Sequence, residues 1–193
     1  MTIYNMFNNI ISKWRNFISE AKVEEQPPEE KPIRVPRPSA GVLLYKKDGE
    51  NILVYLVHEG GPHNENNRYA WGIPKGRIEK GEDIQETAVR EFEEEMGIAL
   101  PNDISFSLGS ITTRSGRVIH GFACEGDLPE GFKPKANMFS MYWHGQHMTI
   151  PEIDDGKWFS VEEAKNIINP KQYPFVDRLE KRLNNPTIYK HET

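Results

Sequence analysis

Four glutamates stand within five residues of one another, at positions 91, 93, 94 and 95. Like charges three or four residues apart on a helix repel by roughly a few tenths of a kcal/mol per pair. Each helical residue turns the side chain by about 100°, so Glu94 lies about 60° to one side of Glu91 and Glu95 about 40° to the other. Carboxylates on one rigid face are the hard ligands that Mg²⁺ or Mn²⁺ prefers. The spacing therefore indicates a divalent-cation site formed by Glu91, Glu94 and Glu95, with a solvated acidic face as the alternative. It leaves Glu93 dispensable.

The helix that must carry these carboxylates is predicted over residues 84–96 and ends at Gly97, since glycine readily adopts the left-handed conformation of a helix C-cap. A separate apolar stripe faces the core and consists of Ala88, Val89, Phe92 and Met96. Arg90 lies on a third side. From there it can reach Glu86 or Glu93 at helical spacing, or fold back toward one of the three ligand candidates.

Strands must support this helix, and four segments have the β-branched and aliphatic composition of strands: residues 39–47, 51–59, about 104–113 and 117–125. The first two are separated by "DGE", which is a hairpin signal. The polar and aromatic segment 137–147 has no assigned element. Strands mixed with substantial helices predict an α/β or α+β sandwich.

The last predicted element is helical and starts at Ser160, which stands three residues before Glu163 in the spacing of a capping box. Pro170 and Pro174 should break it into two pieces, because proline lacks the backbone N–H that a helix interior needs.

The chain has 193 residues, enough for one buried domain with extensions. We expect an amphipathic helix over residues 1–22, a linker rich in proline and charge over 23–38, the catalytic domain over 39–185 and a tail over 186–193. Three interpretations of residues 1–22 stay open. They are packing on the domain or a second subunit, anchoring to a membrane surface or partner through Trp14 between Lys13 and Arg15, and organelle targeting, which Glu20 and the scarcity of arginine disfavour.

The formal net charge is −5, which argues against general nucleic-acid binding, because that requires a clustered basic surface. No apolar stretch reaches the roughly 20 residues that cross a bilayer. Cys124 is the single cysteine, so no intramolecular disulfide can form and a buried structural thiol is expected. A cytoplasmic location follows as the simplest expectation, with peripheral membrane association through residues 1–22 as the alternative.

The acidic helix and its approach loop also match a known signature: Gly, five residues, Glu, seven residues, then Arg-Glu-apolar-any-Glu-Glu-any-Gly-apolar. It is filled without departure by Gly76, Glu82, Arg90, Glu91, Phe92, Glu94, Glu95, Gly97 and Ile98. At an average usage near 5% per residue type, seven fixed identities in register arise by chance on the order of 10⁻⁹ per starting position. The chain therefore resembles the Nudix hydrolase family, over roughly residues 39–183 and including "SAGVLLY", "WGIPKG" and "DGKWFSVEEA".

This resemblance implies an α/β/α sandwich with a mixed β-sheet, a loop-helix-loop catalytic motif, and Mg²⁺-dependent hydrolysis of a nucleoside diphosphate linked to another group. It implies that Glu91, Glu94 and Glu95 are the metal ligands. Glu82 would support the metal cluster and Arg90 would orient a neighbouring carboxylate. Gly76 and Gly97 fit a need for permissive backbone where the loop enters and the helix ends.

Further site candidates rest on chemistry outside the metal face. The carboxylate that accepts the proton of the attacking water is assigned first to Glu94, then to Glu152 or Glu125 from outside the motif. Lys75 in "IPKG" could contact phosphate beside Gly76. Stacking on a nucleotide base is assigned to Trp71, Tyr142 or Trp143, against core or rim packing as the alternative. His144 and His147 are expected in a surface loop instead of a zinc site.

The "PKG" before the signature resembles the diadenosine polyphosphate hydrolases. The combination of "HEGGP", "WGIPKGRIEKGED", "ACEGDL" and "PEIDDGKWF" is similar to an uncharacterised branch of predicted NTP pyrophosphohydrolases. The resemblance thus implies a small nucleotide polyphosphate as substrate, either a dinucleoside polyphosphate or an NTP. Two alternatives stay open: removal of pyrophosphate from RNA 5′ ends, and a non-catalytic nucleotide-binding module, which usually lacks one or more of the signature glutamates.

Overall fold

The computed structural model describes residues 3–20 and 36–185, and the chain divides into two compact units, Met1–Arg34 and Val35–Thr193. The first unit contains helix α1 (Ile3–Glu20), which agrees with the helix expected there. Its exposed apolar side chains are Met6, Phe7, Ile10, Ile11, Trp14 and Phe17. What this face binds stays a prediction. Most of the expected linker and all of the expected tail lie outside the described residues.

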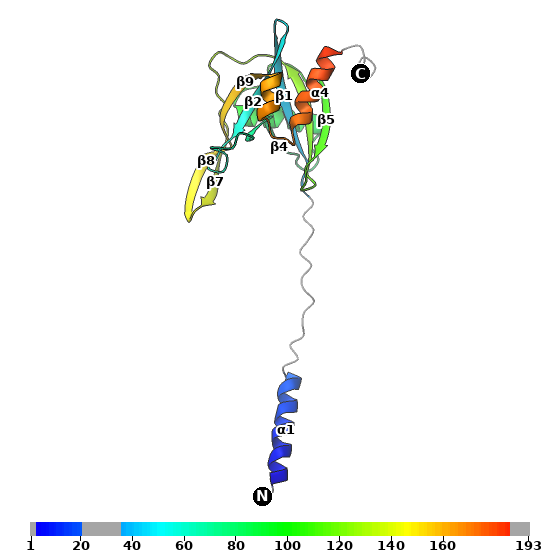
Figure 1. The fold of residues 1–193 in the computed structure, drawn as a ribbon, viewed down its shortest axis with the longest axis vertical. Coiled ribbons are helices and arrows are strands. Elements are labelled where there is room, and N and C mark those ends of the chain that lie inside the picture. Colours follow the sequence, from blue (N-terminus) through cyan, green and yellow to red (C-terminus); the bar gives the residue numbers. More distant parts are fainter. Residues whose placement is uncertain (1–2, 21–35, 186–193) are drawn as a thin grey trace. The chain divides into compact units, whose positions relative to one another are not determined.

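A mixed β-sheet forms the centre of the second unit (Figure 1). Strand β1 (Ser39–Asp48) pairs antiparallel with β2 (Asn51–Glu59), with Tyr45 opposite Val54, and parallel with β6 (Val118–Glu125), with Ser39 opposite Ile119. Beyond β6 lies β5 (Phe106–Thr112), while β3 (Trp71–Gly72) and β9 (Ile153–Ser160) pair with β2. The short strand β4 (Lys75–Arg77) pairs with the beginning of β1. The mixed sheet expected from the family resemblance is confirmed.

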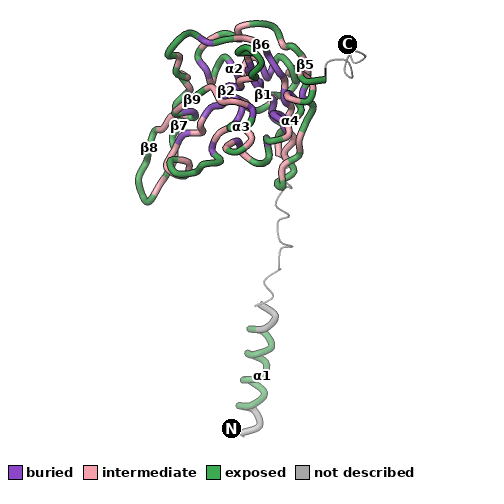
Figure 2. Tube along the Cα trace, turned by 45° about the horizontal axis from the view of Figure 1, so that its top comes forward, coloured by how far each residue is buried: buried purple, intermediate pink, exposed green. Residues whose placement is uncertain are grey.

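Helices cover both faces of this sheet. Helix α2 (Ile84–Met96) packs on one face, where Val42, Leu44 and Phe92 share a core with the buried Cys124. Helices α3 (Val161–Ile167) and α4 (Tyr173–Asn184) cover the other face, where Leu43 packs with Phe175. Successive residues of a strand point to opposite faces, so β1 is apolar from Ala40 to Tyr45, where both of its faces are buried. Figure 2 shows the buried positions concentrated in this part of the domain. The α/β/α sandwich is confirmed.

Local sequence signals set both ends of α2. The side chain of Asp83 accepts the backbone N–H groups of Gln85 and Glu86, and Gly97 closes the helix in the left-handed conformation with φ 71°. Its N–H donates to the carbonyl of Glu93. The start and the end of this helix agree with the prediction, and Ala88, Phe92 and Met96 of the predicted stripe are buried. Val89 is not part of that core and borders a surface hollow.

The C-terminal helical segment is capped as predicted, since Ser160 and Glu163 form a capping box. It is interrupted between Ile167 and Tyr173, but Pro174 does not cause the break. Instead, Pro174 lies in the first turn of α4, where the missing N–H of proline has no helical partner to lose. Between the helices the buried Gln172 accepts the N–H of Ile73 at 2.9 Å and ties this link to the sheet.

Segment 137–147 contributes to a hairpin formed by β7 (Met138–Trp143) and β8 (Gln146–Pro151), which pair with each other and project from the domain (Figure 1). The turn between them has positive φ at His144 (44°) and Gly145 (84°), as type I′ hairpin turns require. His144 is thus in an exposed turn as predicted, whereas His147 lies in β8. None of the helices in the described chain is both long and apolar enough to span a membrane.

Candidate active site

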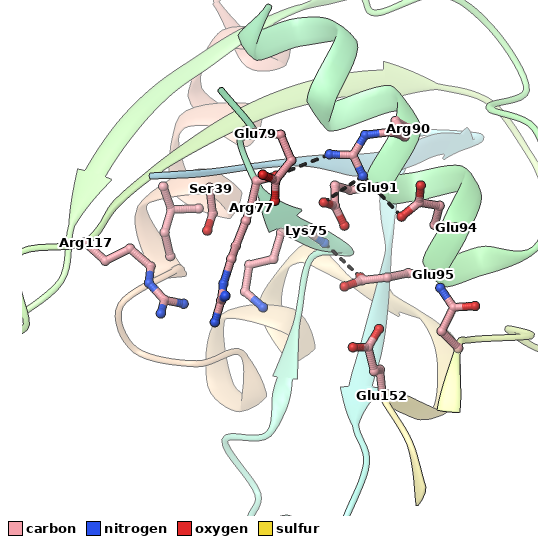
Figure 3. Close-up of a pocket in the computed structure, with 13 residues that line it drawn as sticks. Ser39, Lys75, Arg77, Glu79, Arg90, Glu91, Glu94, Glu95, Arg117 and Glu152 are labelled. Carbon is pink, nitrogen blue, oxygen red and sulfur yellow. Dashed lines mark hydrogen bonds and ion pairs between the residues drawn. The ribbon is translucent and has the colours of Figure 1, made fainter. Parts of the chain in front are cut away.

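A cavity of about 570 Å³ lies where β1 and β6 begin, and elements distant in sequence form its walls. Helix α2 contributes Glu91, Glu94 and Glu95 to one side. Strand β4 contributes Lys75 and Arg77, the turn between β5 and β6 contributes Arg117, and Glu152 enters from the link between β8 and β9 (Figure 3). A carboxylate wall therefore faces a cationic wall across one cavity.

Arg90 holds the acidic wall together. Its Nε and Nη2 donate to the two carboxylate oxygens of Glu82, both at 3.0 Å. Its Nη1 donates to Glu91 at 2.9 Å and to Glu94 at 3.1 Å, and Nη2 also reaches the carbonyl of Arg77 at 3.2 Å. Of the predicted alternatives, Arg90 folds back toward ligand candidates and bonds neither Glu86 nor Glu93 in the described structure. One guanidinium thereby fixes the rotamers of three acidic side chains.

Glu82 lies behind this wall. Besides Arg90, its carboxylate accepts the hydroxyl of Thr87 at 3.0 Å and the backbone N–H of Glu79 at 2.9 Å. The hydrogen bonds from Arg90 are the largest influence that lowers the pKa of Glu82, to about 2. Glu82 therefore stays ionised and links the loop between β4 and α2 to the helix. It supports the ligand candidates from behind and does not line the cavity.

Gly76 and Glu91 touch. A Cβ added at Gly76 would stand 1.8–2.3 Å from the carboxylate atoms of Glu91, far inside contact distance. Gly76 is not among the glycines with positive φ, whereas Gly97 is. The expectation of permissive backbone is thus correct for Gly97 and wrong for Gly76, where the requirement is for space. The absent side chain lets a strand pass directly beneath a carboxylate.

Glu95 is the most deeply buried of the three ligand candidates. Its Oε2 accepts the backbone N–H of Lys75 at 2.8 Å, and burial raises the pKa of Glu95 to about 8. Burial also raises the pKa of Glu91, against the opposing effect of Arg90. The Lys75 ammonium meets Glu59 at 2.9 Å. Buried carboxylates that resist ionisation are an environment in which a divalent cation would be stabilising.

The donor chemistry of this wall fits a hard divalent ion, because Glu91, Glu94 and Glu95 offer carboxylate oxygens to a single cavity. Within the residues that the structure describes, no three acidic, histidine or cysteine side chains converge as a ready metal cluster. The reason is visible in the contacts: Arg90 draws Glu91 and Glu94 to itself, and the N–H of Lys75 holds Glu95. Metal binding would require these carboxylates to rotate toward a common point.

Of the other predicted site residues, the structure places one at the cavity and several away from it. Glu152 lines the cavity. Glu125 bonds Tyr45 at 3.1 Å and stands six residues along β6 from Ile119, about 20 Å away at the strand rise. Trp71 packs edge-on against His58 and Phe159, and the exposed Tyr142 belongs to the projecting hairpin. The assignments of Glu125 to proton transfer and of Trp71 to substrate binding therefore receive no geometric support.

Several residues of the site were not predicted. Arg77 shares a strand face with Lys75 at a spacing of two, a signal that the sequence did contain. Arg117 reaches the cavity because β6 pairs with β1, and Asn137 because its carbonyl accepts the N–H of Glu152 at 2.9 Å. Spacing in the sequence reveals neither contact. Phe139 is an aromatic residue near the site, because it lines a neighbouring hollow of about 250 Å³ that shares Lys75, Glu95 and Glu152 with the main cavity.

Comparisons with known proteins agree with this geometry. The chain is 40% identical over 157 residues to an RNA pyrophosphohydrolase of Roseobacter denitrificans, which covers 72% of this chain and 87% of the relative. Its fold is similar to a C. elegans Ap4A hydrolase (TM-score 0.58, 19% identity, 76% of this chain and 98% of the other). It is also similar to the NUDIX domain of Shewanella oneidensis NrtR complexed with ADP ribose (TM-score 0.55, 16% identity, 83% and 95%). The NUDIX domain family model matches residues 35–179, and the chain therefore belongs to the Nudix family and is a Nudix hydrolase.

Proposed function

We propose that this Nudix hydrolase cleaves a diphosphate linkage in a nucleotide polyphosphate, either a dinucleoside polyphosphate or an NTP, with Mg²⁺ as cofactor and Mn²⁺ as a substitute. The observation that carries the proposal is the pairing of two walls across one cavity: Glu91, Glu94 and Glu95 on α2 against Lys75, Arg77 and Arg117 (Figure 3). Carboxylates alone would repel a polyphosphate, and cations alone would bind it without hydrolysis. The combination suits a metal-assisted phosphate reaction.

The metal would be held by Glu91, Glu94 and Glu95. When bound, Mg²⁺ would supply neutralisation of charge on the diphosphate oxygens and a water of lowered pKa. Arg90 and Glu82 position this ligand set from behind through the hydrogen bonds that fix Glu91 and Glu94. Lys75 and Arg77 lie on the same face of β4 and are placed to bind non-bridging phosphate oxygens.

Glu152 is our choice for the group that accepts the proton of the attacking water. It lines the cavity, and among the described residues its carboxylate has no hydrogen bond or ion pair. Glu94 was the first choice from sequence, but its carboxylate is bonded to Arg90. A carboxylate whose lone pairs are free can accept a proton without first giving up a hydrogen bond.

A substrate panel tests the proposed function. The full chain would be incubated with Mg²⁺ and diadenosine tetraphosphate, ATP, ADP-ribose, a nucleotide sugar and 5′-triphosphorylated RNA, with products separated by chromatography. We expect turnover of the dinucleoside polyphosphate or the NTP. Binding without turnover of any member would instead support the non-catalytic alternative, although all the signature glutamates are present.

RNA with a 5′-triphosphate is the second candidate, favoured by the likeness to the relative from Roseobacter denitrificans that is named RNA pyrophosphohydrolase. The net charge of −5 weighs against a long RNA interface. However, Arg77 and Arg117 concentrate positive charge at the cavity itself, where a 5′ end would enter. Faster turnover of RNA than of ATP in the same panel would make this the function.

Metal binding should be measurable without turnover. We expect Mg²⁺ at ten times its dissociation constant to stabilise the protein by about 1.4 kcal/mol, which corresponds to roughly 3–6 °C in melting temperature for a chain of this size. Glu95→Gln should lose this increment, because it removes a charged ligand. Glu93→Gln should keep it. Thermal melts in EDTA and in Mg²⁺ provide the measurement, and an equal increment in both variants would contradict the ligand assignment.

A further inference from the structure

A second hollow, of about 290 Å³, adjoins the catalytic cavity on its cationic side and shares Lys75, Arg117 and Ile119 with it. Its remaining walls come from the turn between β5 and β6, which supplies Thr113 and Ser115, and from the link between α3 and α4. None of the nine signature positions lines it. Its volume is near the lower end of ligand pockets, as expected of a subsite that holds one chemical group of a larger ligand.

Positive charge dominates this hollow. Lys75, Arg117 and Lys171 line it, and among the described residues its one carboxylate is Glu59, which is already bonded to Lys75 at 2.9 Å. Arg117 and Lys171 make no ion pair within the described part of the chain. Figure 3 shows the nitrogen ends of Arg117, Arg77 and Lys75 gathered on the same side of the site. Cationic side chains that lie close together repel, and an anion bound between them would relieve that repulsion.

One donor of Arg117 lacks a hydrogen-bond partner among the described residues. Its Nε is buried and, within residues 3–20 and 36–185, has no hydrogen-bond partner. A buried donor without a partner is costly, more so on a charged group. A phosphate oxygen in the hollow would supply that partner once the Arg117 side chain turns toward it, and guanidinium groups favour phosphate because their planar N–H groups match its oxygens.

The hollow is also firmly built. The turn that carries Arg117 is closed by hydrogen bonds from the Thr113 N–H to the Arg117 carbonyl at 2.8 Å and from the Arg117 N–H to the Thr113 hydroxyl oxygen at 3.1 Å. The hydroxyls of Thr113 and Ser115 lie 3.0 Å apart. Across the hollow, the N–H of Asn169 donates to the carbonyl of Trp71 at 2.8 Å. The two hydroxyls, and the backbone of the segments that carry Arg117 and Lys171, are thus held in place before a ligand arrives.

We propose that this hollow is an anion subsite in which Arg117 and Lys171 bind a phosphate group outside the diphosphate that is cleaved. The inference rests on the proposed hydrolysis in the adjoining cavity and specifies its substrate class. The protein selects chains of three or more phosphates over compounds with only two, such as ADP-ribose and nucleotide sugars. Specificity arises because the third phosphate satisfies charges that a shorter chain leaves unpaired.

Steady-state kinetics on the full chain test this selectivity. In Lys171→Ala, which changes a residue of the hollow that does not line the catalytic cavity, KM for ATP and diadenosine tetraphosphate should rise by about tenfold or more, on the scale of a lost charge-assisted hydrogen bond, while KM for ADP-ribose changes less than about twofold. Arg117→Ala should raise KM for the longer substrates by more than KM for ADP-ribose, and Arg117→Lys should recover part of that difference. Arg114→Ala, in the same turn but outside the hollow, is the matched control. Equal changes for two-phosphate and longer substrates would overturn the subsite.

A binding measurement separates this inference from the proposed function. Calorimetric titration of the metal-free protein should show that inorganic tripolyphosphate binds more tightly than pyrophosphate, and that Arg117→Ala removes the difference. If no nucleotide is hydrolysed but this difference is present and lost in Arg117→Ala, the proposed function fails and the subsite stands. If nucleotides are hydrolysed but the parent binds both anions equally, the subsite fails alone. Circular dichroism melts would confirm that each variant is folded.

Discussion

Glu94→Gln and Glu95→Gln should each lower kcat by at least ~100-fold, on the scale of removing a major group that stabilises the transition state. Glutamine keeps the size of the side chain and removes its charge. At position 95 its carbonyl oxygen can still accept the N–H of Lys75 that Glu95 binds at 2.8 Å. The fold should therefore survive while the metal ligand is lost. Turnover under saturating substrate and Mg²⁺, with a thermal melt of each variant, provides the measurement.

Glu93→Gln is the control that the helix itself offers. Glu93 lies in the same run of acid but is exposed, and it borders a separate surface hollow with Gln85 and Val89 instead of the catalytic cavity. It should retain nearly the parent rate. Near-normal turnover in Glu94→Gln would contradict the ligand assignment. Glu152→Gln in the same assay should lower kcat with little change in KM, as loss of a proton acceptor does.

Gly76→Ala should disturb the acidic wall of the cavity directly, because position 76 lies beneath the carboxylate of Glu91. The new Cβ would lie 1.9 Å from the carboxylate carbon of Glu91, so either β4 or Glu91 must move. Overpacking of this kind typically costs about 1–3 kcal/mol. Because Glu91 also binds Arg90, we expect kcat to fall by at least ~100-fold, on the scale of losing a principal catalytic contact. Urea unfolding and turnover would be measured together.

The double variant Gly76→Ala with Glu91→Ala identifies the cause. Shortening residue 91 removes the atoms that the new methyl group meets, so the double variant should be more stable than the sum of the two single changes predicts. Activity should not return, because a ligand candidate is still missing. Purely additive free energies of unfolding would show that Gly76 is needed for a reason other than space beneath Glu91.

Local signals explain why α2 could be predicted from the sequence almost residue by residue. Its cap at Gly97, its apolar stripe and its acidic face all depend on neighbours within one or two turns. The first hairpin is similar, since Gly49 with φ 62° occupies the turn between two apolar strands. The capping box of α3 is a third signal contained within four residues.

Contacts between distant segments could not be predicted, because they depend on how the strands pair and not on neighbours along the chain. Arg117 enters the site only because β6 runs parallel to β1, with Ile119 beside Ser39, and no spacing in the sequence encodes that pairing. The need for space at Gly76 depends on a residue 15 positions away on another element. Trp71 has the composition of a stacking residue, but its packing against His58 and Phe159 is decided by the sheet.

The two strands of the projecting hairpin leave and rejoin the domain at the same place. It begins one residue after Asn137 and ends one residue before Glu152, and the N–H of Glu152 donates to the carbonyl of Asn137 at 2.9 Å. The chain thus leaves the rim of the catalytic cavity and returns to the place where it left. An insertion with adjoining ends can lengthen, shorten or change sequence without displacing either rim residue. Relatives can therefore differ in the length of this arm, within the limits of the contacts that Trp143 and Phe139 make with the domain.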